Sequence, residues 1–190
     1  LKEVIEKALN KQIELEASSS QFYLSMASWT ETNGLSGSSS FLYHHSDEER
    51  QHMLKLVKFI NERGGQALIP ALIQPPKTFK SLTHVFESLL EHELNVTESI
   101  NNIVGLCLDE KDFTTHNFMQ WYVAEQLEEE ALARTIIDRL NMIGNDKAGL
   151  YLFDRDLTTE KVYRNTTSNK ITTTLNPPPI FFPTVNLKIL

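Results

Sequence analysis

The chain has only one cysteine, Cys107, so it cannot form a disulfide bond within itself. It also has no run of about 18 apolar residues, which excludes a membrane-spanning helix on length alone. The first residues, beginning at Leu1, lack the apolar segment of a signal peptide. We therefore expect a cytoplasmic protein with no membrane partner. The apolar neighbours of Cys107 predict a buried filler rather than a reactive thiol.

Positive charge is also scarce in this sequence. Lysine and arginine total 18 residues against 25 for aspartate and glutamate, which gives a net charge of -7 and a pI near 5.4. A surface of this sign repels nucleic acid and attracts cations, so we expect no nucleic-acid partner. The hydrophobic content of 41% and the charged content of 23% are typical of a globular protein.

Apolar residues at three- and four-residue spacing predict five helices, at about 3–32, 38–63, 82–109, 113–142 and 146–159. Short connections join the first helix to the second and the third to the fourth, so each pair should be antiparallel. Pro70, Pro75 and Pro76 interrupt the longest connection, between the second and third helices. The sequence therefore predicts an all-α fold, a four-helix bundle with one long crossover and a short fifth helix.

The chain changes character after Val162. Threonine and asparagine residues and the run Pro177-Pro178-Pro179 replace the helical pattern, and the end of the chain is largely apolar. We therefore divide the chain into a helix bundle at 1–160 and an irregular C-terminal extension at 161–190, for which the sequence predicts no definite structure.

Two polar side chains interrupt the apolar stripe of the second predicted helix. Glu49 and His52 share the helical phase of Leu56, so they should point into the core. A buried carboxylate is costly unless a cation or a hydrogen-bond donor accompanies it. Carboxylate oxygens with an imidazole nitrogen suit ferrous iron, and manganese or zinc would compete according to their availability. His45 lies on the same stripe, and we interpret it as a core or interface histidine.

Each of the four long helices carries an acid at an inward phase. These acids are Glu16, Glu49, Glu93 and Glu129. Di-iron bundles take a glutamate from each of two helices and a Glu-x-x-His pair from each of the other two. Here Val96 stands where a histidine would follow Glu93, and the fourth helix offers Gln126 three residues before its acid. We therefore predict an asymmetric two-iron site with Glu49 as the bridge.

Three further acids, Glu48, Glu125 and Glu128, lie next to these positions. The acidic run at 125–130 would usually be a solvated helix face. Its phase instead brings it beside the inward stripe, so we predict a third, weaker iron position. Tyr23 also faces inward, two turns after the acid of the first helix, where either simple packing or a redox or hydrogen-bonding role is open.

Several segments resemble the bacterial-type non-haem ferritins, and the likeness covers about residues 1–160. The most specific segments are 15–23, 47–53, 117–130 and 149–152, together with the helix that carries Glu93. The resemblance implies a ferritin-like four-helix bundle that assembles into a hollow cage of 24 identical subunits. It also implies a ferroxidase, which oxidises Fe(II) with O2 or H2O2 and stores Fe(III) as a mineral.

The resemblance also implies individual roles. The catalytic and iron-binding residues that it implies are Glu16, Tyr23, Glu49, His52, Glu93, Gln126 and Glu129. The first iron would lie at Glu16, Glu49 and His52. The second would share Glu49 and take Glu93 and Glu129.

The acids Glu48, Glu125 and Glu128 match the third iron position of the same family. Bacterioferritins, a sister family, bind haem through a methionine where this chain has Arg50, so we expect no haem. Two other hypotheses stay open. One is a soluble di-iron oxidase or peroxidase of the rubrerythrin-like type, a class that more often has the second histidine absent at Val96. The other is a non-catalytic cage subunit whose acids bind divalent ions only for stability.

Overall fold

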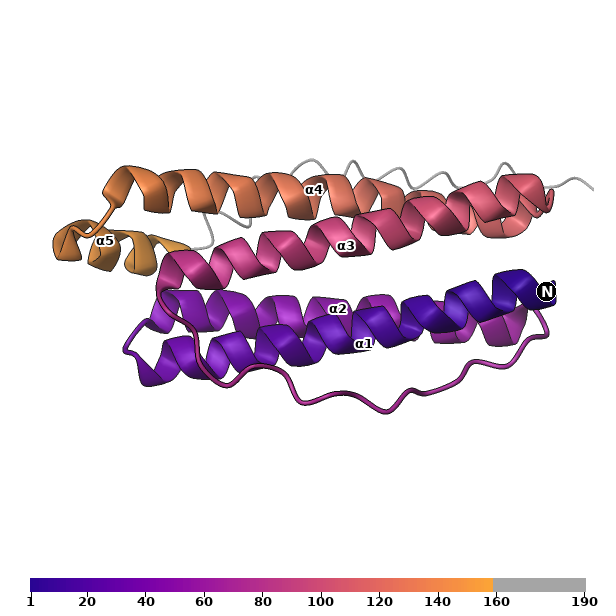
Figure 1. The fold of residues 1–190 in the computed structure, drawn as a ribbon, viewed down its shortest axis with the longest axis horizontal. Helices are drawn as coiled ribbons and strands as arrows, with labels where there is room; N and C mark the ends of the chain where they lie inside the picture. The colour runs from indigo at the N-terminus through magenta and orange to yellow at the C-terminus, as the bar shows by residue number, and fades with distance from the viewer. Residues whose placement is uncertain (159–190) are drawn as a thin grey trace, which may run out of the picture.

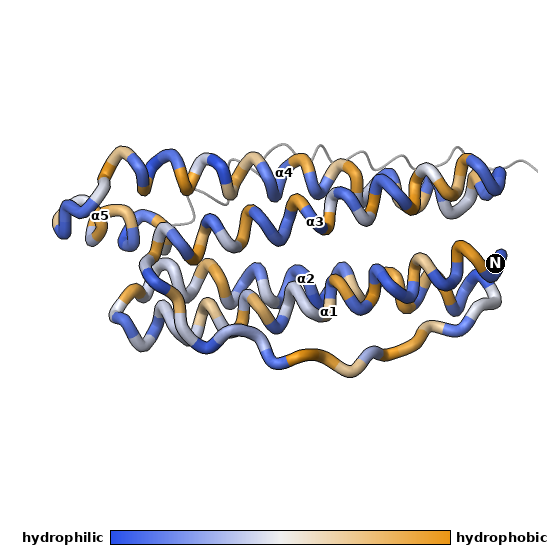
Figure 2. The backbone as a smooth tube through the Cα atoms, viewed as in Figure 1, coloured by the Kyte–Doolittle hydropathy of each residue, from blue (hydrophilic) through white to orange (hydrophobic). Residues whose placement is uncertain are grey.

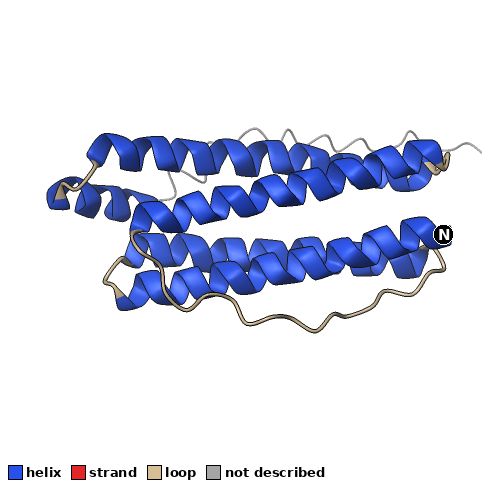
Figure 3. Ribbon diagram, in the orientation of Figure 1, coloured by secondary structure: helices blue, strands red, loops and turns tan. Residues whose placement is uncertain are grey.

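The computed structural model describes residues 1–158, and the predicted extension at 161–190 lies outside the described residues. In the described part, every regular element is a helix (Figure 3). The helices are α1 (Glu3–Thr32), α2 (Ser36–Glu62), α3 (Leu82–Asp109), α4 (Phe113–Ile143) and α5 (Lys147–Thr158). The all-α prediction is confirmed, and each predicted helix end lies within two residues of the observed one. Within residues 1–158, no helix is both long and apolar enough to cross a membrane.

The long helices pack as two antiparallel pairs, α1 with α2 and α3 with α4 (Figure 1). The first pair is joined by a tight turn at Gly34, whose φ of 77° is a left-handed conformation that glycine adopts without strain. The crossover at 63–81 returns along the whole length of the bundle before α3 begins. As a result α2 and α3 run parallel, as the proline-interrupted connection predicted.

Two apolar clusters fill the bundle, one on each side of its middle. The α5-side cluster includes Tyr23, Phe41, Phe86, Ile136 and Phe153. The N-side cluster includes Ile5, Leu9, Leu56, Ile100 and Cys107. Cys107 is completely buried, and burial raises the pKa of its thiol to about 11, which agrees with the predicted role as an apolar filler. Along each long helix, the residues of one cluster end before those of the other begin, and this leaves a middle section for polar residues.

Asp154 fastens α5 to the beginning of α2. Its carboxylate accepts hydrogen bonds from the backbone N–H of Gly37 at 2.9 Å, the backbone N–H of Ser38 at 2.8 Å and the hydroxyl of Ser38 at 2.7 Å. The first N–H groups of a helix have no partner inside it, so this buried carboxylate caps α2 and meets the positive end of its dipole. Glycine is required at position 37, since a Cβ there would lie 1.7 Å from the carbonyl oxygen of Asp154.

We expect Asp154→Ala to lower the free energy of unfolding by about 2 kcal/mol, because it leaves two buried N–H groups and a hydroxyl without their acceptor. Thermal denaturation of the metal-free protein should show a midpoint lower by roughly 4–8 °C. Asp156→Ala is the matched control, because Asp156 is 59% exposed and pairs with its neighbour Arg155 at the surface. Equal midpoints for the two variants would contradict the capping role.

Candidate metal centre

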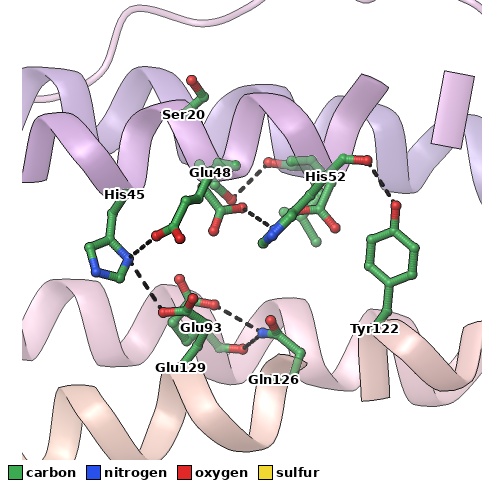
Figure 4. A network of polar contacts seen from close by, with 12 residues as sticks. Ser20, His45, Glu48, His52, Glu93, Tyr122, Gln126 and Glu129 are labelled. Atoms are coloured by element: carbon green, nitrogen blue, oxygen red, sulfur yellow. Dashed lines mark hydrogen bonds and ion pairs between the residues drawn. The ribbon is translucent and has the colours of Figure 1, made fainter. Parts of the chain in front are cut away.

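A group of buried polar side chains separates the two apolar clusters (Figure 4). Its members are Glu16 from α1, Glu49 and His52 from α2, Glu93 from α3, and Gln126 and Glu129 from α4. None of these residues is more than 7% exposed. Each helix turns its polar residues inward because they continue the stripe of its apolar ones. The structure therefore brings together all six residues that the sequence indicated as iron ligands.

Glu16, Glu49 and His52 form one group of possible ligands. One donor atom from each lies within 4.8 Å of the others. The Nδ1 atom of His52 is 3.6 Å from an oxygen of Glu49 and 3.9 Å from Oε2 of Glu16. Two carboxylates and one imidazole at this separation can close around a single divalent cation with small side-chain movements.

Glu93 is held on both of its carboxylate oxygens. The Tyr23 hydroxyl donates to Oε1, and the Gln126 amide donates to Oε2 at 2.9 Å. Tyr23 therefore has a hydrogen-bonding role, and its partner is on α3, which its spacing from Glu16 on α1 did not reveal. Both donors stabilise the charged form of the Glu93 carboxyl group, against the effect of burial.

The electrostatics of this group favour a bound cation. Burial raises the pKa of Glu16 and Glu49 well above the ordinary glutamate range, and the repulsion of nearby carboxylates raises it further. Burial, and then the charge of Glu129, raise the pKa of Glu93 to about 7. The Oε2 atom of Glu16 is buried without a hydrogen bond to any described residue. A cation would supply this atom with a partner and balance the charge of the group.

His45 forms a second group of possible ligands, with Glu48 and Glu129. Its Nδ1 atom lies 3.5 Å from Glu48 and 3.4 Å from Glu129 (Figure 4). Burial opposes a charge on this imidazole, but the two carboxylates outweigh burial and raise its pKa. His45 is buried, as predicted, and its ring packs on the core residue Phe41, while its Nδ1 atom is also placed where it could bind a metal. The available signal was its position one turn before Glu49 on the same inward stripe.

The acids predicted for a third iron meet only in part. Glu48 and Glu125 line the same open cavity of about 390 Å³, beside His52 and Trp121. Glu128 is half-buried on α4 and lies outside this lining. Glu48 is therefore the acid common to the cavity and to the group around His45.

The sequence pattern of the ferritin-like domain matches residues 6–143, which is most of the chain and, apart from the first three residues of α1, includes the four helices that carry the centre. The chain belongs to the ferritin family. It is similar to a probable bacterial non-heme ferritin-like protein of Haemophilus influenzae, with 46% identity over 157 residues, 83% of this chain and 95% of that protein. It is 47% identical to the bacterial non-heme ferritin of Campylobacter jejuni over 154 residues, 81% of this chain and 92% of that protein.

Solved structures agree with this assignment. An open pore ferritin of the archaeon Archaeoglobus fulgidus superimposes on this ferritin with a TM-score of 0.83 and 43% sequence identity. The superposition covers 84% of this chain and 97% of that one. The ferritin-like bundle predicted from the sequence is thereby confirmed.

In this ferritin, two aromatic residues of α4 pack beside His52. The Tyr122 hydroxyl donates to the backbone carbonyl of His52 at 2.8 Å, and the Trp121 ring lies edge-on to the imidazole with 5.2 Å between centroids. The Lys55 ammonium lies 3.2 Å above the Trp121 ring. These contacts fix the backbone that carries His52.

The raised pKa of Glu93 predicts that the metal-free ferritin loses stability as the pH rises. A carboxyl group with a pKa of about 7 in the folded chain, against an ordinary value of 4.5, holds its proton more tightly when folded. The contribution of this group to the free energy of unfolding is fully present below about pH 4.5 and is lost as the pH rises through about 7. The loss is roughly 3 kcal/mol. Urea denaturation in the presence of a chelator, between about pH 4.5 and 8, measures this change.

Glu93→Gln should reduce that dependence on pH, because the amide does not titrate. Exposed Glu91, on the same helix, provides the control Glu91→Gln, which should retain the wild-type slope. A wild-type protein whose stability rises over this range, or a Glu93→Gln variant with an unchanged slope, would contradict the assigned electrostatics.

Proposed function

We propose that this ferritin oxidises Fe(II) at the buried centre and stores the product as an Fe(III) mineral. The observation that carries the proposal is the meeting of four glutamates, a histidine and a glutamine from four helices at one buried place between apolar clusters. The names of its relatives, bacterial non-heme ferritins, support the same function. No nucleic-acid surface or haem enters this proposal.

The two iron positions follow from the grouping of donors. Glu16, Glu49 and His52 hold the first iron, and their donor atoms already lie within 4.8 Å of one another. Glu49 also interacts electrostatically with Glu93 and Glu129, so its carboxylate is the one suited to bridge to a second iron. Glu93 and Glu129 complete the second position, and Gln126 stays hydrogen-bonded beside it.

The chemistry proposed is a two-electron oxidation shared by two substrate ions. Each Fe(II) gives up one electron, and O2 takes up both electrons with two protons and leaves as H2O2. With H2O2 as the oxidant, the same two electrons and two protons yield two water molecules. The carboxylates favour this direction because hard anionic oxygens bind Fe(III) more strongly than Fe(II). Tyr23 keeps Glu93 oriented through the hydroxyl bond to Oε1.

A third iron position is proposed at Glu48. The sequence indicated Glu125 and Glu128 as its partners, and Glu125 does line the same cavity. The alternative partners are His45 and Glu129, whose donor atoms lie closer together. Iron bound per subunit should fall from three to two in Glu48→Gln. A matching fall in Glu125→Gln, with no change in His45→Ala, would assign Glu125 as a partner. A fall in His45→Ala, with no change in Glu125→Gln, would assign His45 and Glu129.

The proposed storage vessel is a cage of 24 subunits. In each subunit, residues 1–160 are the ferritin-like bundle and residues 161–190 are an extension. The crossover supports contacts between copies, since hydrophobic residues recur along it (Figure 2). Leu68, Ile69 and Ile73 are 56%, 71% and 92% exposed, far more than a chain without partners would favour. The mass of the assembly in solution, near 24 times that of the 21.8 kDa chain, tests this stoichiometry.

The rubrerythrin-like alternative finds no support at position 96. Val96 is 1% exposed and packs in the N-side cluster, so an apolar contact replaces the second histidine ligand. We therefore retain iron storage as the proposed function.

Stopped-flow measurement of Fe(II) oxidation is the experiment that tests the proposal. The wild-type protein should oxidise about two Fe(II) per subunit in a fast phase, and Glu49→Gln should slow this phase at least about 100-fold, because it removes the bridging charge. Glu62→Gln, at an exposed acid on the same helix, is the control and should keep the fast phase. Equal rates in the wild type and Glu49→Gln would refute the centre.

A further inference from the structure

Gln12 is a completely buried polar residue on α1, one helical turn before Glu16. Its side-chain Nε2 donates to Oε1 of Glu16 at 2.9 Å. Its Oε1 accepts a hydrogen bond from the Ser99 hydroxyl of α3 at 2.5 Å. A chain of three side chains therefore runs from α3, through Gln12, to the carboxylate proposed as the first iron ligand.

The direction of this chain follows from the donors and acceptors available. The amide N–H of Gln12 points to Oε1 of Glu16, and a carboxyl oxygen can accept this bond whether the group is protonated or ionised. The amide oxygen then faces Ser99, and the serine hydroxyl must be the donor. The serine donates to the amide oxygen and the amide N–H donates to Glu16, so the bond from Ser99 fixes the orientation of the Gln12 amide.

The same bonds leave the two oxygens of Glu16 in different surroundings. Oε1 is occupied by Gln12, whereas Oε2 has no hydrogen bond to any described residue and lies 3.9 Å from Nδ1 of His52. The atom without a donor is therefore the one that lies near the imidazole of His52, another possible ligand. Gln12 thereby stops the carboxylate from rotating and keeps Oε2 available.

We propose that Gln12, held by Ser99, is a positioning residue that presents Oε2 of Glu16 to the first iron. The inference rests on the proposed role of Glu16 as an iron ligand and adds a partner beyond the six residues of the centre. Hydrogen bonds of this kind to a metal-binding carboxylate fix its orientation, and their loss weakens metal binding about 10- to 100-fold. The donor on Gln12 also lowers the pKa of Glu16, against the larger effect of burial.

The test uses the metal-free, assembled full chain and two redox-inert probes. Zn(II) titration by calorimetry measures the affinity of the site, and the visible absorption of bound Co(II) reports its coordination geometry. Gln12→Met keeps the length of the side chain and removes its donor, so Zn(II) should bind about 10- to 100-fold more weakly and the Co(II) spectrum should change. Ser99→Ala should show a smaller loss, and Ser99→Thr, which keeps the hydroxyl, should restore the wild-type values.

Thr30→Val is the control for the loss of a buried polar group on the same helix. Among the residues that the structure describes, the Thr30 hydroxyl bonds only to backbone carbonyls of its own helix, so this variant should bind both metals as the wild type does. Unchanged Zn(II) affinity and an unchanged Co(II) spectrum in Gln12→Met would overturn the positioning role.

Glu16→Gln separates this failure from that of the proposed centre. If Glu16→Gln also binds Zn(II) normally, the ligand assignment itself is wrong. If it loses binding while Gln12→Met does not, only the positioning role is wrong.

Discussion

The structure depends on one electrostatic constraint, the burial of several carboxylates at the same place in an apolar bundle. Glu16, Glu49, Glu93 and Glu129 are each no more than 7% exposed. Ionised carboxylates in such surroundings repel one another and lose their hydration, so they must bind protons or a cation. Protons can neutralise the group in the metal-free protein, and a bound cation can replace them. Metal binding and the protonation of the site are therefore two solutions to the same constraint.

The rest of the bundle keeps these carboxylates close together and away from water. Apolar clusters on both sides exclude water, and the helices fix the backbone from which each ligand projects. Hydrogen bonds then hold individual side chains: Tyr23 and Gln126 act on Glu93, and Gln12 acts on Glu16. A site that is both buried and held in this way can bind and release ions while its framework stays in place.

Helical periodicity predicted much of this arrangement. The inward stripes identified the helices and the six central residues, because the phase along a helix determines which face is buried. Phase does not determine the register between helices, so the contact of Tyr23 with Glu93, the neighbours of His45 and the bond from Ser99 to Gln12 were not predictable. The register between helices is set by the combined packing of many side chains. Similarly, Asp154 appears in the sequence only as one acid of a short helix, and its role emerges once α5 folds against α2.

The central claim is that the buried carboxylates form a cation site, and anomalous X-ray diffraction from Zn(II)-soaked crystals tests it most directly. The account predicts a strong peak about 2.0–2.2 Å from Oε2 of Glu16, a Glu49 oxygen and Nδ1 of His52, with a second peak that shares Glu49. Zinc found only at exposed acids, with no peak among Glu16, Glu49 and His52, would contradict it.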